Sequence, residues 1–210
     1  MKKSMEKNPY TKYEQQIDYT GKKIGMWFFL FTELLFFGGM FLLYSVYRYR
    51  YPEDFHTAAM GENIVIGSIN TAILLTSSLS IAVSISAIEK GNRKLSVLLQ
   101  ILTILLGLVF LVNKYFEWTE KIFRGIYPNS PVLLNQSKGQ ILFFSLYYVM
   151  TGIHGLHVLI GTIVISFMVV FSLKGVITRE NFSKLENTGL YWHFVDIVWI
   201  YLFPLFYLIT

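Results

Sequence analysis

The sequence predicts an all-α integral membrane protein, a bundle of five transmembrane helices. Of its 210 residues, 54% are hydrophobic and only 15% are charged, and the charges cluster outside long apolar runs. The longest run, 141–173, has 33 residues without one Asp, Glu, Lys or Arg, whereas a helix of about 20 apolar residues already crosses a bilayer. The sequence lacks the segments of about 10 residues with alternating polarity that typify a membrane β-barrel.

Five runs long enough to span a membrane follow one another along the chain: 24–47, 64–88, 95–117, 141–173 and 190–209. The first is apolar apart from one carboxyl, and the second is uncharged but rich in Ser, Thr and Asn. Residues 1–23 form a polar, lysine-rich N-terminal tail, so we expect the membrane domain to cover 24–210. The short loops leave no room for a soluble catalytic domain.

The basic residues predict the orientation in the membrane. The N-terminal tail and the loops at 90–94 and 174–184 carry 12 Lys and Arg, and the opposite loops carry five. Because cytoplasmic loops are enriched in Lys and Arg, we expect a cytoplasmic N-terminal tail and, after five spans, an external C-terminus. The net charge of +5 then reflects these loops, and we expect no nucleic-acid partner.

The fourth run contains two histidines, His154 and His157, at a depth where polar side chains are expensive and often mark function. At about 100° per residue, the two histidines share one helical face. The small residues Thr151, Gly155 and Thr162 form an adjacent face, which another helix can approach closely. These two faces predict a helix that is buried among other helices.

Glu33 is the one carboxyl of the first run, surrounded by Met and Phe residues. Counted from the start of the run, it lies about 13 Å into the membrane at about 1.5 Å per residue. One interpretation is a structural hydrogen bond to a neighbouring helix, and the other is proton handling or contact with a lipid headgroup. Because one carboxyl makes no relay by itself, the structural interpretation is favoured.

In the fifth run, His193 and Asp196 lie one turn apart, flanked by tryptophans. We expect a mutually satisfied polar pair completed by Trp donors, with a proton relay as the alternative. Depth along the helices matches Glu33 with His154, and His157 with Asp196, which predicts two cross-helix pairs.

The third run ends in a charged and aromatic stretch. Glu117 and Trp118 are typical of an anchor at the membrane interface. Lys114 lies three residues before Glu117, the spacing of a charge pair on one helical face.

The sequence predicts no catalytic residue and no metal or haem bound by this chain. It contains no cysteine, which excludes thiolate ligands and thiol catalysis. Of its four histidines, His56 lies in a loop. The expected depths of His193 and His154 differ by roughly 7 to 8 Å, so a site that joins them with His157 would need an offset helix.

Several stretches together resemble subunit III of the haem-copper terminal oxidases, the cytochrome c oxidase subunit III family. They are KIGMWFFLFTELLFF (23–37), with Glu33 in the position of the family's membrane carboxylate, NTAILLTSS (70–78), FEW (116–118), TGIHGLHVLIG (151–161) and WHFVDIVWIYLFPLFY (192–207). The resemblance covers roughly residues 22–208. Many members have seven helices, whereas this chain resembles the short bacterial form with five, so lipid contacts of the missing pair are not carried over.

The resemblance implies a non-catalytic subunit of a respiratory oxidase in the bacterial cytoplasmic membrane. Such a subunit binds no redox cofactor, packs beside subunit I in a complex with subunit II and other subunits, and holds phospholipid. Haem and copper belong to its partner subunits, and it is thought to support proton uptake and sustained turnover.

Other functions remain as alternatives to this one. They are a homologue in a quinol oxidase or a nitric-oxide-reductase-associated complex, a stand-alone proton or ion transporter, and a haem-binding membrane cytochrome. Five spans without an inverted repeat argue against a transporter, and the electron donor stays open.

Overall fold

The structure, a computed structural model, describes the backbone of residues 9–208 and the side chains of residues 20–208. Residues 1–8 of the predicted tail and residues 209–210 at the end of the fifth run lie outside this part. Seven helices make up nearly all of the described chain: α1 Pro9–Arg50, α2 Pro52–Ala59, α3 Ile64–Glu89, α4 Arg93–Phe123, α5 Pro131–Leu134, α6 Lys138–Leu173 and α7 Ser183–Tyr207.

The expected total of five helices is wrong, because the connections contain two short ones. α2 and α5 begin with Pro52 and Pro131, and the fixed φ of proline suits the first helical turn. The sequence prediction rests on long apolar runs, and helices of 8 and 4 residues leave no such run. The five helical segments that are long and apolar enough to cross a membrane are Thr20–Arg50, Ile64–Glu89, Arg93–Phe123, Lys138–Leu173 and Ser183–Tyr207.

The long helices extend beyond their apolar runs. α1 begins at Pro9, inside the predicted polar tail, and α7 begins seven residues before its run, at Ser183. Asn63, Asn92 and Ser137 precede α3, α4 and α6, and each side chain accepts a hydrogen bond from a backbone N–H three residues ahead. Such caps satisfy N–H groups that have no partner within the helix, so they and not polarity set these helix starts.

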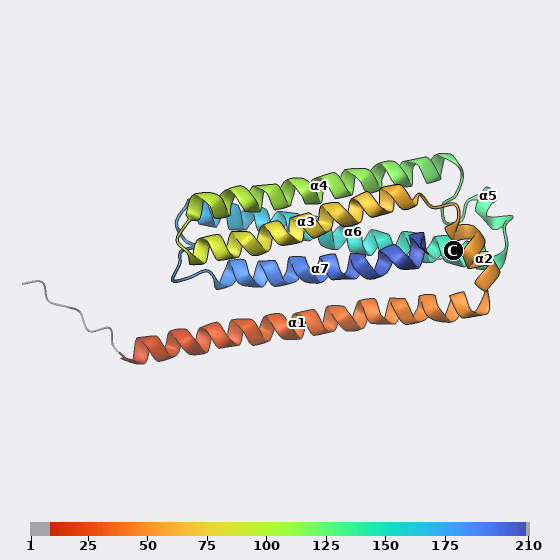
Figure 1. Cartoon of the computed structure of the whole chain (residues 1–210). Coiled ribbons are helices and arrows are strands. Elements are labelled where there is room, and N and C mark those ends of the chain that lie inside the picture. The colour runs from red at the N-terminus through yellow and green to blue at the C-terminus, as the bar shows by residue number, and fades with distance from the viewer. Residues whose placement is uncertain (1–8, 209–210) are drawn as a thin grey trace, which may run out of the picture.

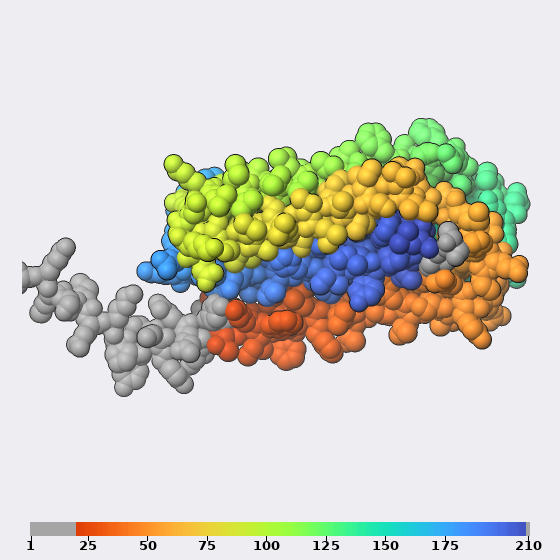
Figure 2. Space-filling model, in the orientation of Figure 1, coloured from red at the N-terminus to blue at the C-terminus, as the bar shows by residue number. Residues whose placement is uncertain are grey.

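Four helices form a bundle, and α1 lies along one side of it (Figure 1). α3 and α6 each pack on both α4 and α7, while α1 meets the long helices mainly through α6 and α7. In the space-filling view, α1 runs beside α7 for most of its length (Figure 2). Only 11% of the most apolar stretch of α1 is buried, against 50% for α7. α1 therefore presents most of its surface outward.

Glycines let α4, α6 and α7 meet around one indole ring. A Cβ atom at Gly107 of α4 would lie 2.8 Å from both Thr162 of α6 and Trp192 of α7. A Cβ atom at Gly161 of α6 would lie equally close to Trp192. Gly155, also in the small-residue face predicted on α6, lies opposite a leucine of α4. Larger residues at Gly107 or Gly161 would force the three helices apart.

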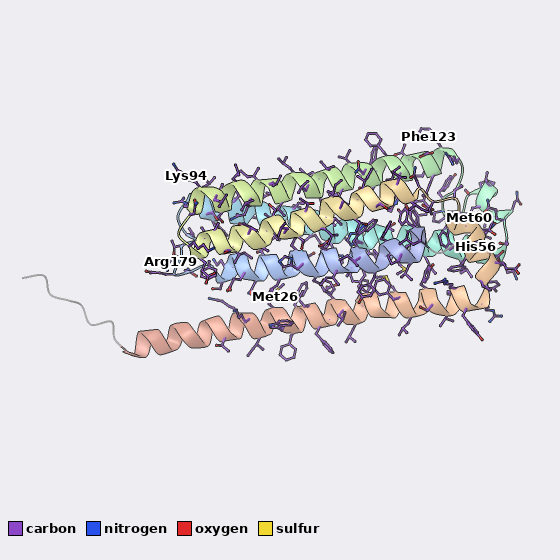
Figure 3. All side chains as sticks on the ribbon, viewed as in Figure 1. Met26, His56, Met60, Lys94, Phe123 and Arg179 are labelled. Atoms are coloured by element: carbon purple, nitrogen blue, oxygen red, sulfur yellow. The ribbon has the colours of Figure 1, made fainter. Side chains whose placement is uncertain are left out.

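The connections gather at two ends of the bundle. Lys94 and Arg179 lie at the end where α1 begins, while His56, Met60 and Phe123 lie at the other end (Figure 3). The α3–α4 and α6–α7 loops, two of the three basic segments, therefore share the end where the first helix starts. This is the arrangement that the predicted topology requires.

Candidate functional site

Glu33 of α1 pairs with His157 of α6. Glu33 Oε2 lies 3.2 Å from His157 Nε2, and both side chains are mostly buried. The ring of Phe37 packs edge-on against the imidazole, with ring centroids 5.2 Å apart. The depth estimate matched Glu33 with His154 and His157 with Asp196, and both expected pairs are wrong.

The contact of the other ring nitrogen of His157 indicates where that ring carries a hydrogen. His157 Nδ1 lies 2.8 Å from the backbone carbonyl oxygen of Ile153. A carbonyl only accepts hydrogen bonds, so Nδ1 carries a hydrogen. The contact at Nε2 then needs one more proton, placed either on the Glu33 carboxyl or on the imidazole.

A cleft of about 420 Å³ opens beside this pair, between α1, α6 and α7. Tyr191 of α7 forms part of its wall and donates a hydrogen bond to the His157 carbonyl oxygen at 3.1 Å. Met26, near the start of the apolar part of α1, points toward the bundle beside it (Figure 3). Besides the pair, the lining is mainly apolar: Met26, Phe29, Ile160, Val164, Asn187, Thr188 and Tyr191.

His154 is fully buried and separate from this pair. Its ring stacks on Trp199, with centroids 5.3 Å apart, and meets Phe110 edge-on at 5.5 Å. Neither of its ring nitrogens has a hydrogen-bond partner in the part of the chain that the structure describes. His154 thus packs as an aromatic ring in the core of the bundle.

His193 and Asp196 do not form the direct pair expected from the sequence. His193 Nδ1 lies 2.6 Å from the Ser78 hydroxyl of α3, which also contacts the Asp196 carboxyl. The expected Trp donors reach α3 instead, because Trp192 bonds to Ser77 and Trp199 to Thr71, both at 3.0 Å. The polar residues of the second run therefore serve as partners for α7.

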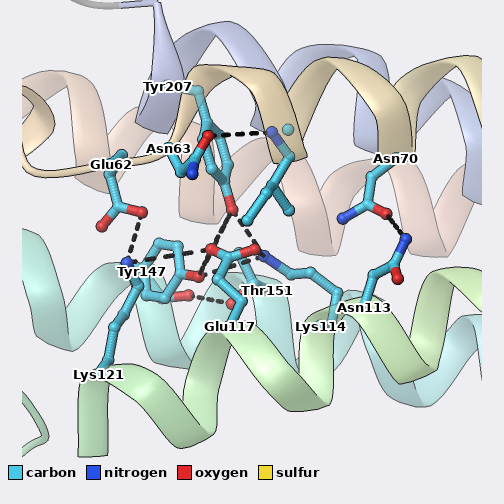
Figure 4. A network of polar contacts seen from close by, with 12 residues as sticks. Glu62, Asn63, Asn70, Asn113, Lys114, Glu117, Lys121, Tyr147, Thr151 and Tyr207 are labelled. Carbon is cyan, nitrogen blue, oxygen red and sulfur yellow. Dashed lines mark hydrogen bonds and ion pairs between the residues drawn. The ribbon is translucent and has the colours of Figure 1, made fainter.

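A second polar cluster surrounds Glu117 inside the bundle (Figure 4). Glu117 Oε2 lies 3.1 Å from Lys114 Nζ, and Glu117 Oε1 accepts hydrogen bonds from the hydroxyls of Tyr147 and Tyr207, the latter at 2.5 Å. Lys121 Nζ lies 4.0 Å from Glu117. Glu117 is thus a buried group that joins α4, α6 and α7, while Thr151 in the same view bonds back to the Tyr147 carbonyl oxygen.

Glu62 extends this cluster to the α2–α3 connection. Its Oε2 lies 2.6 Å from Lys121 Nζ, and the residue is only 7% exposed. Burial raises the pKa of the Glu62 carboxyl, and the charge of Lys121 opposes this shift. A cavity of about 460 Å³ adjoins Glu62, Glu117 and Lys121 at this end of the bundle.

The sequence indicated only part of the Glu117 cluster. Lys114, Glu117 and Lys121 recur at spacings of three and four, which places all three on one face of α4. Glu62 lies in a loop, where no periodic pattern marks it. Trp118, expected beside Glu117 at the interface, packs on Tyr148 with ring centroids 5.1 Å apart.

The described residues bring no three His, Asp or Glu side chains together in a way that could hold a metal ion. The histidines of the long helices have separate surroundings. His154 lies between aromatic rings, His157 faces Glu33, and His193 faces Ser78.

The fold and these clusters define a class of protein: a multi-pass helical membrane protein with polar groups buried within and beside its bundle. The family described as cytochrome c oxidase subunit III matches residues 3–210, and the chain belongs to this family. It is a subunit III of a haem-copper oxidase.

Similar proteins carry different names within this family. Cytochrome c oxidase subunit 3 of Alkalihalophilus pseudofirmus is 32% identical, with 89% of this chain and 86% of the relative covered. A probable quinol oxidase subunit 3 of Staphylococcus saprophyticus is 31% identical, with 89% and 88% covered. A heme-copper oxidase subunit I+III of Aeropyrum pernix is 30% identical, and the match covers 88% of this chain but 22% of that relative.

We expect His157 to be coupled energetically to Glu33 and not to Asp196. Removing either member of the pair leaves the other without its partner, at about 1 to 3 kcal/mol. The double variant of His157→Phe and Glu33→Leu should therefore lose less than the sum of the single losses in thermal unfolding of the purified complex. His157→Phe combined with Asp196→Asn is the control, and its losses should add. Additive losses for His157 and Glu33 would contradict the pairing.

We expect Lys114→Met to destabilise the protein by about 3 to 5 kcal/mol, because Glu117 then keeps a buried charge without its closest cation. Adding Glu117→Gln should recover part of this loss. Arg124→Met is the matched control, since its pair with Glu120 is exposed and should contribute at most about 1 kcal/mol. Thermal unfolding followed by circular dichroism measures all three. Equal losses for Lys114→Met and Arg124→Met would contradict a role for burial.

Proposed function

We propose that this chain is a non-catalytic subunit that packs on subunit I of its oxidase, holds phospholipid and supports proton uptake during sustained turnover. Haem and copper then belong to partner subunits, and subunit II and further subunits complete the assembly. The observation that carries this proposal is the Glu33–His157 pair at the side of an apolar cleft.

The cleft has the two parts that a phospholipid needs. Its walls, including Phe29, Ile160 and Val164, suit an acyl chain. Glu33, His157 and the amide of Asn187 supply polar contacts along the same cleft. Because α1 meets the bundle mainly through α6 and α7, which form this cleft with it, a lipid in the cleft would also help to hold α1 in place.

The shared proton of Glu33 and His157 supports a role in proton uptake. A carboxyl and an imidazole in contact exchange a proton with little movement, and such pairs inside membranes mark proton relays. Asn187 and Thr188, near the start of α7, line the same cleft, and a proton would reach the pair along this polar part of the lining.

The separate surroundings of the histidines support the absence of a redox cofactor on this chain. Haem and copper sites draw several imidazoles to one point. Here the rings of His154, His157 and His193 are each engaged by different neighbours on different helices. The relative that is named subunit I+III, with both subunits in one name, supports association with subunit I.

Purification of the tagged chain in mild detergent should bring down a larger subunit with haem and copper, together with phospholipid. The chain separated from every other subunit should be colourless, and a stoichiometric haem absorbance in it would contradict the proposal.

Glu33→Gln should still assemble, but the complex should retain less phospholipid and lose activity sooner during turnover. Gln cannot share a proton with His157, and it changes the polar contact that the cleft offers. Glu53→Gln, on the short helix α2, is the control and should behave as the native complex. Equal lipid content and equal active lifetime in both variants would contradict the role of the cleft.

We further propose that the end with Lys94 and Arg179 is cytoplasmic and that the end with Met60 is external, on the basis of the distribution of basic residues. The native chain has no cysteine, so single cysteines report accessibility without background. A membrane-impermeant thiol reagent should label Met60→Cys in intact cells, and Lys94→Cys and Arg179→Cys only after the membrane is opened. The reverse pattern would invert the topology.

A further inference from the structure

The outward surfaces of the bundle differ in chemistry. α4 presents a continuous aliphatic surface, with the exposed residues Leu98, Ile101, Leu105, Leu108, Val109 and Val112. Such a surface suits lipid acyl chains. On α3, exposed aliphatic residues such as Ile69 and Leu79 alternate with the small residues Ser68, Ala72 and Thr76, so its surface is mixed. Small residues of this kind occur where membrane helices pack on one another, because they let two backbones approach closely.

His193 is a polar group of α7 at its contact with α3. It is half-buried, and its Nδ1 faces Ser78 at 2.6 Å. Its Nε2 has no hydrogen bond to any group among residues 20–208. Whichever nitrogen carries the hydrogen, Nε2 remains a donor or an acceptor that hydrocarbon cannot satisfy.

His193 lies too deep in the membrane for water or lipid headgroups to hydrogen-bond its Nε2 readily. Ser78, its partner, is 11 residues from the end of α3 at Glu89, which corresponds to about 16 Å at 1.5 Å per residue. The other end of α3 is farther away. At this depth a partly exposed imidazole normally faces protein.

Asp196 shows that the same cluster is incomplete. Asp196 is only 4% exposed, it contacts the Ser78 hydroxyl, and its Oδ1 accepts no hydrogen bond in the described part of the chain. Ser78, His193 and Asp196 thus contain two polar atoms without partners, and both belong to α7 beside α3. Because Asp196 Oδ1 is buried, a hydrogen-bonding group at this surface can reach only His193 Nε2.

We propose that the α3–α7 surface, defined by Leu75, Ser78 and Ala82 of α3 and by His193 and Ile197 of α7, is where this chain docks on subunit I. Leu75 and Ala82 lie one turn from Ser78, and Ile197 lies one turn from His193, so all five share one side of the bundle. A membrane helix of subunit I packs against this surface and places a hydrogen-bonding side chain at His193 Nε2. The inference rests on the proposed association with subunit I and names the surface that makes it.

Photo-crosslinking within the intact oxidase tests which surface meets subunit I. p-Benzoylphenylalanine replaces, one at a time, Leu75 or Ile197 on the proposed surface, and Leu105 of α4 or Leu35 of α1 as controls. The four side chains are similarly exposed, at 47%, 50%, 54% and 60%. Adducts with subunit I are expected from positions 75 and 197, at least fivefold above those from 105 and 35.

The outcomes separate the surface from the association. Adducts mainly from position 105 or 35, or from none of the four in a complex that contains subunit I, would overturn the docking surface and leave the association standing. Absence of subunit I from the purified chain would overturn both.

Substitution of His193 tests the hydrogen bond itself. An interhelical hydrogen bond in a membrane typically changes an equilibrium by about threefold, so His193→Phe should lower the retention of subunit I in detergent by about that factor. His193→Gln, which restores a donor and an acceptor, should recover most of it. His56→Phe, a histidine on α2 outside this surface, is the control. Equal retention in His193→Phe and His56→Phe would overturn the hydrogen bond at this site.

Discussion

The arrangement of the bundle depends on one constraint, the need of buried charge for partners where water is absent. Glu117 meets this need with Lys114 and two tyrosine hydroxyls, which come from α4, α6 and α7. Removing one partner of a buried ion pair costs about 3 to 5 kcal/mol, whereas replacing the whole pair by apolar residues is often neutral. The Glu117 cluster therefore adds little net stability over an apolar core, but it penalises every packing of these helices that separates its members.

The long apolar runs predicted the five membrane-crossing helices, because hydrocarbon thickness leaves few other ways to use 18 or more apolar residues. They did not predict α2 and α5, which begin with prolines, and of the two only α5 has a side-chain cap, from Ser130. Depth estimates failed for a related reason. Counting from residue 190 places His193 about 5 Å into the membrane at 1.5 Å per residue. However, α7 begins at Ser183, and the contact with Ser78 places His193 deep along α3. Because polar residues continue α7 before its apolar run, the first apolar residue is a poor marker of where the helix begins.

The candidate site was predictable residue by residue but not pair by pair. Glu33 and His157 stood out because charged and imidazole side chains are rare in apolar runs. Which of them meet depends on how helices neighbour and rotate, and a single sequence does not encode this in any local pattern. Glu62 shows the limit most clearly. It lies in a loop like any solvated carboxylate, and only the fold brings it onto Lys121 in a buried position.

α7 takes part in both proposed binding surfaces, one on each of its sides. Tyr191 faces the cleft with Glu33 and His157, while His193, two residues further, faces α3 and the outer surface. The two proposals place subunit I on the α3–α7 surface and lipid in the cleft, so the two partners would not compete for one surface. Relatives named for cytochrome c and for quinol are about equally similar to this chain, at 32% and 31% identity. The proposed roles in lipid retention and proton uptake involve no electron donor, so the proposal applies to both kinds of oxidase.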